Sequence, residues 1–102
     1  MAFDMYVGDD HAWIDGHEED LFELAKDPGK FPRLNRLLER WYEDSVLSPE
    51  EANATLHELI AIRIEIENNQ TGYRHLLRVV DRLVPVLSIA YTKGEIIQCK
   101  GD

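Results

Sequence analysis

Residues 7–24, VGDDHAWIDGHEEDLFEL, concentrate side chains that can do chemistry. Within twelve positions they place six carboxylates and two imidazoles, which are Asp9, Asp10, His11, Asp15, His17, Glu18, Glu19 and Asp20. Carboxylate oxygens and imidazole nitrogens bind metal ions, and a pair of carboxyl groups can serve as general acid and base. Clustered negative charge can also attract a cationic protein. The spacing of these residues tests each chemistry in turn.

The familiar metal-binding patterns do not fit this stretch. An EF-hand loop with Gly16 at its sixth position has Trp13 third and Phe22 last, where oxygen ligands are required. A zincin helix needs a second histidine four residues after the first, but Leu21 follows His17 at that distance. We therefore assign no metal and no cofactor. An irregular metal or ligand site in this hairpin stays open as an alternative, with Asp9, Asp10, His11 and His17 as its candidate ligands.

The sequence carries no recognisable catalytic motif, and we expect no enzymatic activity. The serines at positions 45, 48 and 88 lack a Gly-x-Ser-x-Gly context, and no glycine-rich phosphate loop is present. No apolar enclosure marks out one pair of the many carboxylates for acid–base work. Cys99 is the single cysteine and cannot form an internal disulfide, which fits a reducing compartment.

Net charge is the strongest bulk property. The 102-residue chain has a net charge of −9, and residues 1–27 hold nine acidic and one basic side chain. This balance argues against binding to nucleic acid or to an anionic membrane surface and favours a basic protein partner. With 44% hydrophobic residues and no long apolar run, we expect one soluble, cytoplasmic, globular domain over residues 1–102.

The N-terminal region predicts a hairpin followed by two helices. Residues 3–7 and 11–14 are rich in aromatic and aliphatic side chains around the turn residues Gly8, Asp9 and Asp10, which is typical of a β-hairpin. A helix is expected over residues 17–27, with acidic residues in its first turn. A second helix is expected over residues 32–44, with Pro32 in its first turn. Its apolar side chains recur on one face, and Trp41 on that face is expected to lie in the core.

The C-terminal half predicts two longer helices and a final strand. Ser48, Pro49 and Glu51 form a capping-box signature for a third helix. From Ile60 to Glu67 the sequence IAIRIEIE alternates as a strand would, so helix and strand both remain open there, and we favour helix. A largely apolar helix is expected over residues 72–93, kinked by its proline, and a strand over residues 95–99 that pairs with the hairpin.

These elements predict an α+β fold of about four helices and a small antiparallel sheet. Arginines recur on the second helix (Arg33, Arg36, Arg40) and on the fourth (Arg74, Arg78, Arg82). They are compatible with an anion-binding stripe, but a solvated face that pairs with the abundant carboxylates is favoured. Trp13, in the hairpin, is a candidate anchor for a partner.

The order of FDMYV, HEEDLFEL, KFPRLNRLLERWYED, SPEE and a closing GD resembles small bacterial proteins of the immunity type, which neutralise interbacterial toxins. The resemblance covers residues 3–60 and, weakly, the tail, and its motifs are structural rather than catalytic. It implies a non-enzymatic inhibitor that occupies the active site of a cognate toxin or an adjacent surface. A nuclease toxin would be basic because it holds phosphates, so an acidic inhibitor can imitate their charge.

The sequence therefore predicts a protein-binding module whose acidic front end attracts a cationic toxin. The expected partner-binding residues are Asp9, Asp10, Trp13, Asp15, Glu18, Glu19, Asp20 and Glu23. The alternatives are the metal- or ligand-binding hairpin and a homo-oligomeric regulatory module that uses excess apolar surface on the fourth helix.

Overall fold

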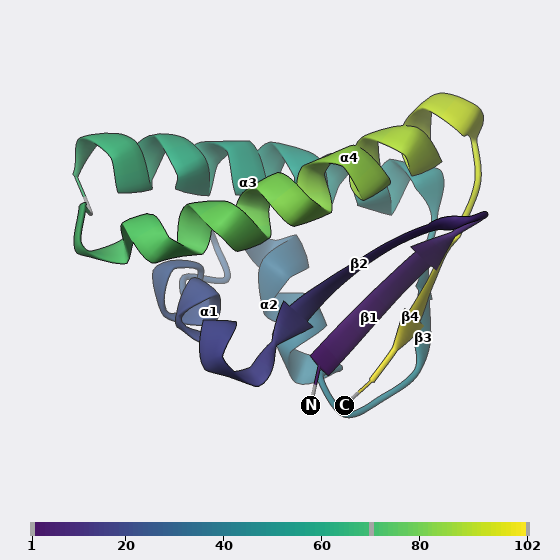
Figure 1. Ribbon diagram of the computed structural model, residues 1–102, viewed down its shortest axis with the longest axis horizontal. Coiled ribbons are helices and arrows are strands. Elements are labelled where there is room, and N and C mark those ends of the chain that lie inside the picture. The colour runs from purple at the N-terminus through teal and green to yellow at the C-terminus, as the bar shows by residue number, and fades with distance from the viewer. Residues whose placement is uncertain (1, 70, 102) are drawn as a thin grey trace.

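The computed structural model describes residues 2–69 and 71–101 and shows an α+β fold (Figure 1). The strands are β1 (Ala2–Val7), β2 (Asp10–Asp15), β3 (Ser45–Leu47) and β4 (Ile97–Lys100). The helices are the 3-10 turn η1 (Gly16–Glu18), α1 (Asp20–Leu24), α2 (Pro32–Glu39), α3 (Pro49–Asn68), the 3-10 segment η2 (Thr71–Leu76) and α4 (Leu77–Lys93).

The four strands form one antiparallel sheet in the order β2-β1-β4-β3. The hairpin turn uses Gly8 at φ +55°, a conformation that glycine adopts without steric cost. Strand β4 pairs with β1, with Met5 opposite Cys99, so the expected closure by the C-terminal strand is confirmed. The short strand β3 was not predicted, because three residues give almost no periodic signal.

Each strand turns alternate side chains into the protein. Phe3, Met5 and Val7 of β1 are buried, as are Ala12 and Ile14 of β2. Successive side chains of a strand point to opposite faces, so the residues between them lie on the outer face of the sheet. The hairpin therefore has one apolar face toward the helices and one face toward solvent.

Helices α3 and α4 run side by side in opposite directions along one edge of the molecule (Figure 1). The capping box at the start of α3 forms as predicted: the Glu51 N–H donates to Ser48 Oγ at 3.1 Å, and the Ser48 N–H donates to Glu51 Oε1 at 3.1 Å. The helix continues through residue 68, so residues 60–67 are helical. Their alternation buries Ile62 and Ile66 and leaves the intervening isoleucines exposed.

The other helices differ in extent from the prediction. The expected helix over 17–27 is divided into η1 and α1, and α2 ends at Glu39 rather than at residue 44. The chain leaves α2 early because it must turn to place β3 beside β4. The expected helix over 72–93 begins as the 3-10 segment η2 before α4, which contains Pro85 and ends at Gly94 with φ +67°.

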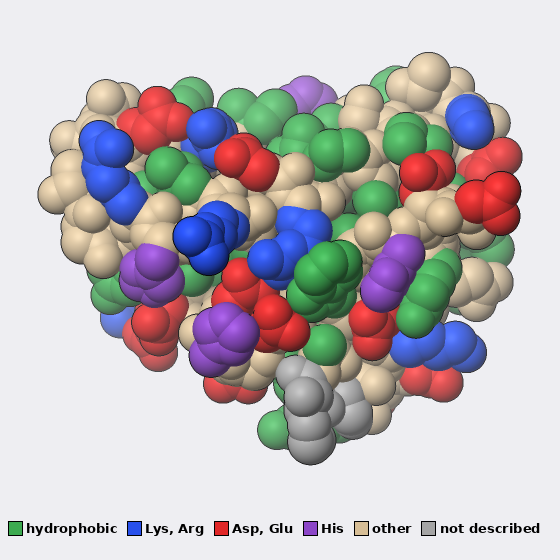
Figure 2. Space-filling view, in the orientation of Figure 1, with side chains coloured by type: hydrophobic (Ala, Val, Ile, Leu, Met, Phe, Trp, Pro, Cys, Tyr) green, Lys and Arg blue, Asp and Glu red, His purple; other side chains and the backbone are tan. Residues whose placement is uncertain are grey.

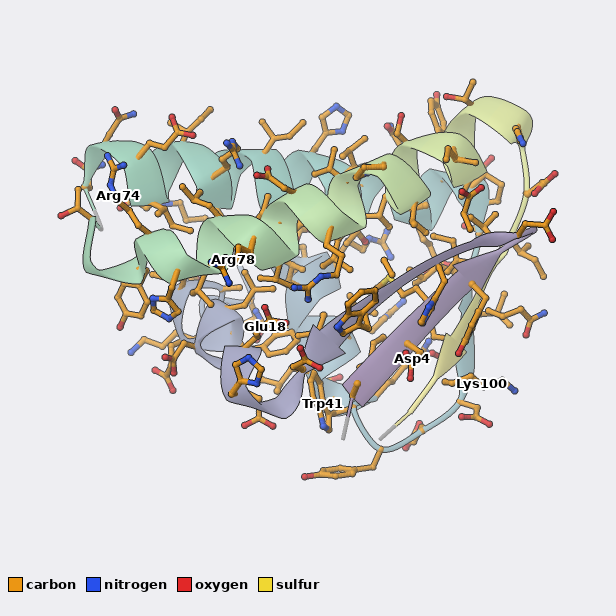
Figure 3. The ribbon with its side chains drawn as sticks, in the orientation of Figure 1. Asp4, Glu18, Trp41, Arg74, Arg78 and Lys100 are labelled. Carbon is orange, nitrogen blue, oxygen red and sulfur yellow. The ribbon has the colours of Figure 1, made fainter. Side chains whose placement is uncertain are left out.

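Trp41 belongs to the core, as predicted. It is 3% exposed and lies at the end of the sheet near α1 and α2 (Figure 3). Its ring stacks on Phe3 with centroids 5.8 Å apart and meets the ring of Phe22 edge-on at 5.7 Å. These aromatic contacts fix the junction between the hairpin and the first helices.

No helix within residues 2–69 and 71–101 combines the length and the apolar character that crossing a bilayer requires.

Candidate partner-binding face

A continuous row of rings lies on the outer face of the hairpin. The strand register places Tyr6 directly opposite His11, and Trp13 follows His11 two residues later on β2. The Tyr6 and His11 rings stack with centroids 4.5 Å apart, and the His11 and Trp13 centroids are 5.4 Å apart. Arg82 of α4 ends the row, with its guanidinium carbon 4.5 Å from the centre of the Trp13 ring. We call Tyr6, His11, Trp13 and Arg82 the aromatic row.

Arg82 is held in place by hydrogen bonds from its guanidinium group. Nη1 donates to Trp13 O at 3.0 Å and to Glu18 Oε1 at 2.7 Å, and Nη2 donates to Glu18 Oε2 at 3.3 Å. The first bond satisfies a carbonyl on the outer edge of β2, and the other two form a bidentate ion pair. Arg82 thus ties α4 to the sheet edge and supports one face of the Trp13 ring.

Glu18 does not belong to the exposed acidic surface that we expected. It is 6% exposed and points between η1 and α4 (Figure 3). Its Oε1 also accepts a hydrogen bond from the Asp15 N–H at 3.0 Å, which turns the carboxylate back toward the hairpin. Burial by itself raises the pKa of Glu18, but the bonds from Arg82 and Asp15 and the Arg82 charge outweigh it and lower that pKa below its usual value.

Carboxylates flank the aromatic row and orient its rings. His11 Nε2 lies 2.8 Å from Asp4 Oδ1, and Trp13 Nε1 donates to Asp15 Oδ2 at 3.3 Å. Asp4 lies on the solvent side of β1, opposite Lys100 of β4 (Figure 3). These contacts limit the rotamers of His11 and Trp13, so the row presents a largely fixed surface.

The predicted acidic cluster is divided into two groups by the fold. Asp9 and Asp10 are exposed at the hairpin tip, where Glu95 Oε2 would lie 3.8 Å from a Cβ placed on Gly8. The exposed residues Glu19, Asp20 and Glu23 follow the other end of β2. The six residues of β2 span about 17 Å, and the aromatic row lies between the two groups.

Among the described residues, most of these carboxylates form no salt bridge with a lysine or an arginine. Within residues 2–69 and 71–101, no Lys or Arg nitrogen forms a salt bridge with Asp9, Asp10, Asp15, Glu19 or Glu23. Asp20 lies 3.8 Å from His75 Nε2. Figure 2 nevertheless shows acidic, basic and histidine side chains interspersed over this side of the molecule. The expected continuous acidic surface is therefore two separate groups of carboxylates.

The basic side chains follow the predicted pairing only in part. Arg33 and Arg36 each approach Glu51, at 3.7 and 3.8 Å, as a solvated paired face would. Arg82 of α4 is drawn into the protein, whereas Arg78 of α4 and Arg74 of the preceding segment η2 are exposed (Figure 3). Arg78 borders a shallow hollow of about 320 Å³ that His17, Glu18 and His75 also line.

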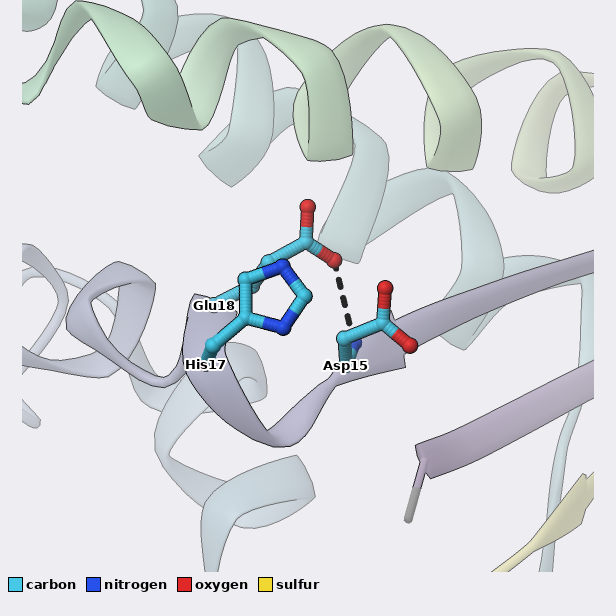
Figure 4. Close-up of side chains that lie close together, drawn as sticks. All are labelled: Asp15, His17 and Glu18. Carbon is cyan, nitrogen blue, oxygen red and sulfur yellow. Dashed lines mark hydrogen bonds between the residues drawn. The ribbon is translucent and has the colours of Figure 1, made fainter.

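The structure brings together one group that resembles a metal site in composition. Asp15, His17 and Glu18 each offer a potential ligand atom, and these atoms lie within 4.8 Å of one another (Figure 4). Both Glu18 oxygens, however, accept hydrogen bonds from the Arg82 guanidinium, which would face any bound cation. The trio is better explained as part of the ion pair that anchors α4 than as a metal centre.

Sequence reasoning assigned Trp13 to a partner contact, but it considered His11 only as a metal ligand and Arg82 only as part of an arginine face, and it did not consider Tyr6. The alternation in FDMYV and HAWI contained a signal for Tyr6 and His11, because it separates Phe3 and Met5 from Tyr6, and Ala12 from His11. Arg82 carried no such signal, because its contact with Trp13 joins residues 69 positions apart.

Comparison with known proteins found no match: no family model fits this sequence, and no curated protein and no solved structure is significantly similar to it.

Proposed function

We propose that this chain is a non-enzymatic protein-binding module, an acidic immunity protein that neutralises a cationic bacterial toxin in the cytoplasm. The observation that carries the proposal is the aromatic row of Tyr6, His11, Trp13 and Arg82 between two groups of exposed carboxylates. Trp, Tyr and Arg are the residues most enriched among the energetic hot spots of protein interfaces.

The row has the properties of a preorganised anchor. Arg82 supports Trp13 from α4, and the hydrogen bond to Asp15 holds the indole N–H. A side chain that is already ordered loses little conformational entropy on binding, so more of its contact energy contributes to affinity. Tyr6 is 39% exposed, so an Arg or Lys side chain of a partner can contact its ring from the solvent side.

The two acidic groups suit a partner that carries positive charge on both sides of the contact. Asp9 and Asp10 at the hairpin tip, and Glu19, Asp20 and Glu23 beyond β2, would steer a cationic surface onto the row. Trp13 and Asp15 lie between them and complete the expected site. Glu18 takes part indirectly, because it positions Arg82.

The non-enzymatic part of the proposal is supported by the condition of the reactive groups. Cys99 is 1% exposed, and burial raises the pKa of its thiol to about 11, so it is a poor nucleophile near neutral pH. Glu18 and Asp15 are engaged by internal donors, and His11 lies against Asp4. These groups are arranged to hold a surface rather than to act on a substrate.

A growth-rescue experiment tests the proposal. The product of the open reading frame next to this gene is expressed as the candidate toxin, alone and together with this protein. We expect the wild type to restore growth and Trp13→Ala to fail. Tyr42→Ala is the matched control, because Tyr42 is an aromatic residue outside the row and is 76% exposed.

Binding measurements with the purified pair then separate anchor from charge. Trp13→Ala should weaken binding mainly through faster dissociation, whereas Asp9→Asn with Asp10→Asn should slow association at low salt and have little effect at high salt. A harmless neighbouring product, or one that kills equally well in the presence of this protein, would refute the proposal. Rescue by Trp13→Ala at wild-type level would refute the assignment of the row.

A further inference from the structure

The apolar residues that were expected to be in excess on the fourth helix are packed inside, since Val80, Leu83 and Leu87 are fully buried. Apolar side chains instead line a hollow of about 380 Å³, where the loop over residues 25–31 faces α3 and η2. In Figure 1 this loop joins α1 to α2 and lies beside the end of the helical pair that η2 forms. We call this hollow the loop pocket.

The floor of the loop pocket is apolar and comes from four segments. Leu24 belongs to α1, Phe31 to the end of the loop, Ile62 to α3 and Tyr73 to η2. Ile62 and Phe31 are 1% and 6% exposed, and Leu24 and Tyr73 pack against the core as half-buried residues. Because this floor is continuous with the core, the pocket is formed before a ligand arrives.

The loop that forms one wall is ordered by its own hydrogen bonds. The N–H groups of Lys30 and Phe31 both donate to Asp27 O, at 3.0 and 2.8 Å. The Gly29 N–H donates to Asp27 Oδ1 at 2.9 Å, so the Asp27 carboxylate, which also lines the pocket, is engaged in this turn. A wall that is already ordered loses little conformational entropy when a ligand binds.

Charged side chains of opposite sign border the floor from different segments. Lys26 and Lys30 lie on the loop, whereas Glu23 lies on α1 and Glu65 on α3. Lys30 Nζ lies 5.7 Å from the centre of the Phe31 ring, which places an ammonium group beside the aromatic floor. Within residues 2–69 and 71–101, none of these two lysines and two glutamates forms a salt bridge. Their charges are therefore open to a ligand.

We propose that the loop pocket binds a free α-amino acid that carries an aromatic or large aliphatic side chain. The ligand's side chain covers the apolar floor, its carboxylate faces Lys26 and Lys30, and its ammonium group faces Glu23 and Glu65. Glu65 Oε2 accepts a hydrogen bond from Asn69 Nδ2 at 3.2 Å, which orients this carboxylate and leaves Oε1 for the ammonium group.

A ligand with a single charge fits the loop pocket less well. An anion would approach the two glutamates, and a cation would approach the two lysines, so in each case like charges meet. An α-amino acid carries both charges next to its side chain and so matches the lysines, the glutamates and the floor together. The volume of the pocket lies at the low end of the range for small-molecule sites, which suits a ligand of this size.

The affinity should be modest because the charged side chains are open to solvent. Lys26, Lys30 and Glu23 are exposed and Glu65 is half-buried, so water screens each ion pair with the ligand. Loss of one such pair should weaken binding by about threefold. The proposal does not depend on the proposed function, because the loop pocket shares no residue with the aromatic row and only Glu23 with the acidic groups.

Titration of the isotope-labelled full chain with L-phenylalanine, followed by NMR, tests the site. We expect saturable shifts of the Leu24, Phe31 and Tyr73 backbone amides at millimolar ligand. Phenethylamine lacks the carboxylate and phenylpropionate lacks the ammonium group, so each should bind more weakly by about threefold or more. Absence of saturable shifts at these amides would overturn the proposal, and so would a singly charged analogue that binds as tightly as phenylalanine. No partner protein is needed, so the result stands whatever the growth-rescue experiment shows.

Two variants assign the charges. Glu65→Gln should weaken L-phenylalanine by about threefold but should not weaken phenylpropionate, which has no ammonium group to lose a partner. Lys30→Gln should weaken L-phenylalanine but not phenethylamine, which has no carboxylate. Glu43→Gln is the control, because Glu43 is an exposed carboxylate outside the pocket. If Glu65→Gln or Lys30→Gln behaves like the control, or weakens all ligands equally, the charge assignment is contradicted.

Discussion

Replacing Arg82 with leucine is the sharpest test of how the aromatic row is built. The substitution keeps an aliphatic side chain on α4 but removes the guanidinium from Glu18, from Trp13 O and from the Trp13 ring. Glu18 would keep its hydrogen bond from the Asp15 N–H and would remain buried, with its charge otherwise uncompensated. The protein should therefore lose stability and the row should lose its order at Trp13.

The size of the loss follows from the burial of the pair. The side chains of Arg82 and Glu18 are 21% and 8% exposed, so solvent screens their interaction only in part. Removing one member of a buried pair costs about 3–5 kcal/mol of unfolding free energy, because the other charge stays desolvated. The remaining bond to Asp15 and the partial exposure of Arg82 favour the lower end, about 3 kcal/mol.

The loss should depend on pH in a defined direction. In the wild type the pKa of Glu18 is lowered, so the pair contributes stability that is present above the unfolded pKa, near 4.5, and is lost as pH falls through the folded value. In Arg82→Leu, burial acts with little to oppose it and raises that pKa above its usual value. The difference between variant and wild type should therefore be largest near neutral pH and shrink toward about pH 4, where the Glu18 carboxyl of the variant is protonated.

Urea unfolding at neutral pH and at about pH 4, followed by far-UV circular dichroism, measures this difference in the free energy of unfolding. Arg78→Leu is the matched control, one turn earlier on α4 and exposed, and it should change stability by less than about 0.5 kcal/mol. In Glu18→Gln combined with Arg82→Leu, the loss should be smaller than the sum of the single losses. An equal loss at both pH values, or additive single and double variants, would refute the coupling between Glu18 and Arg82.

Two further predictions concern the ends of the fold. Ser48→Ala should lower the free energy of unfolding by about 1 kcal/mol, because the Glu51 N–H at the start of α3 loses its acceptor, and urea unfolding measures it. A loss as small as that of Thr92→Ala, an exposed hydroxyl in the last turn of α4, would contradict the cap. Cys99 should react with a thiol reagent only after denaturation, because its pKa of about 11 leaves about 0.1% thiolate at pH 8 and its sulfur is covered. Labelling of the native protein at the rate of a free cysteine would show that β4 leaves the sheet.

The parts of the fold that could be predicted are those whose signal is local. The capping pair Ser48 and Glu51 predicts the start of α3 within four residues, and Gly94 predicts the end of α4. The alternation from Ile60 to Glu67 left helix and strand both open, and the favoured helix is confirmed, because a helix with apolar residues on two opposite sides also alternates there. The exposed side of this helix carries Ile60 and Ile64, and the buried side carries Ile62 and Ile66.

The candidate site was predicted less completely, because its geometry depends on contacts distant in sequence. Proximity in sequence suggested one acidic cluster from Asp9 to Glu23, but the extended strand β2 separates its two halves. Nothing near Glu18 indicates that it is buried, since its partner Arg82 lies 64 residues away. A pattern of charges along a chain predicts net charge well and the shape of a charged surface poorly.

The burial of Glu18 also bears on how the row could work as a binding surface. A buried ion pair contributes little net stability compared with apolar residues of the same volume, but it fixes one arrangement because each partner is costly without the other. Here the pair fixes the distance between α4 and β2, and Trp13 lies at that junction. Glu18 was expected to belong to the acidic partner-binding surface, but it is better placed to position Trp13, the proposed anchor. It follows that Glu18→Gln should impair binding through the order of Trp13, whereas loss of Asp9 and Asp10 should impair it through the rate of encounter.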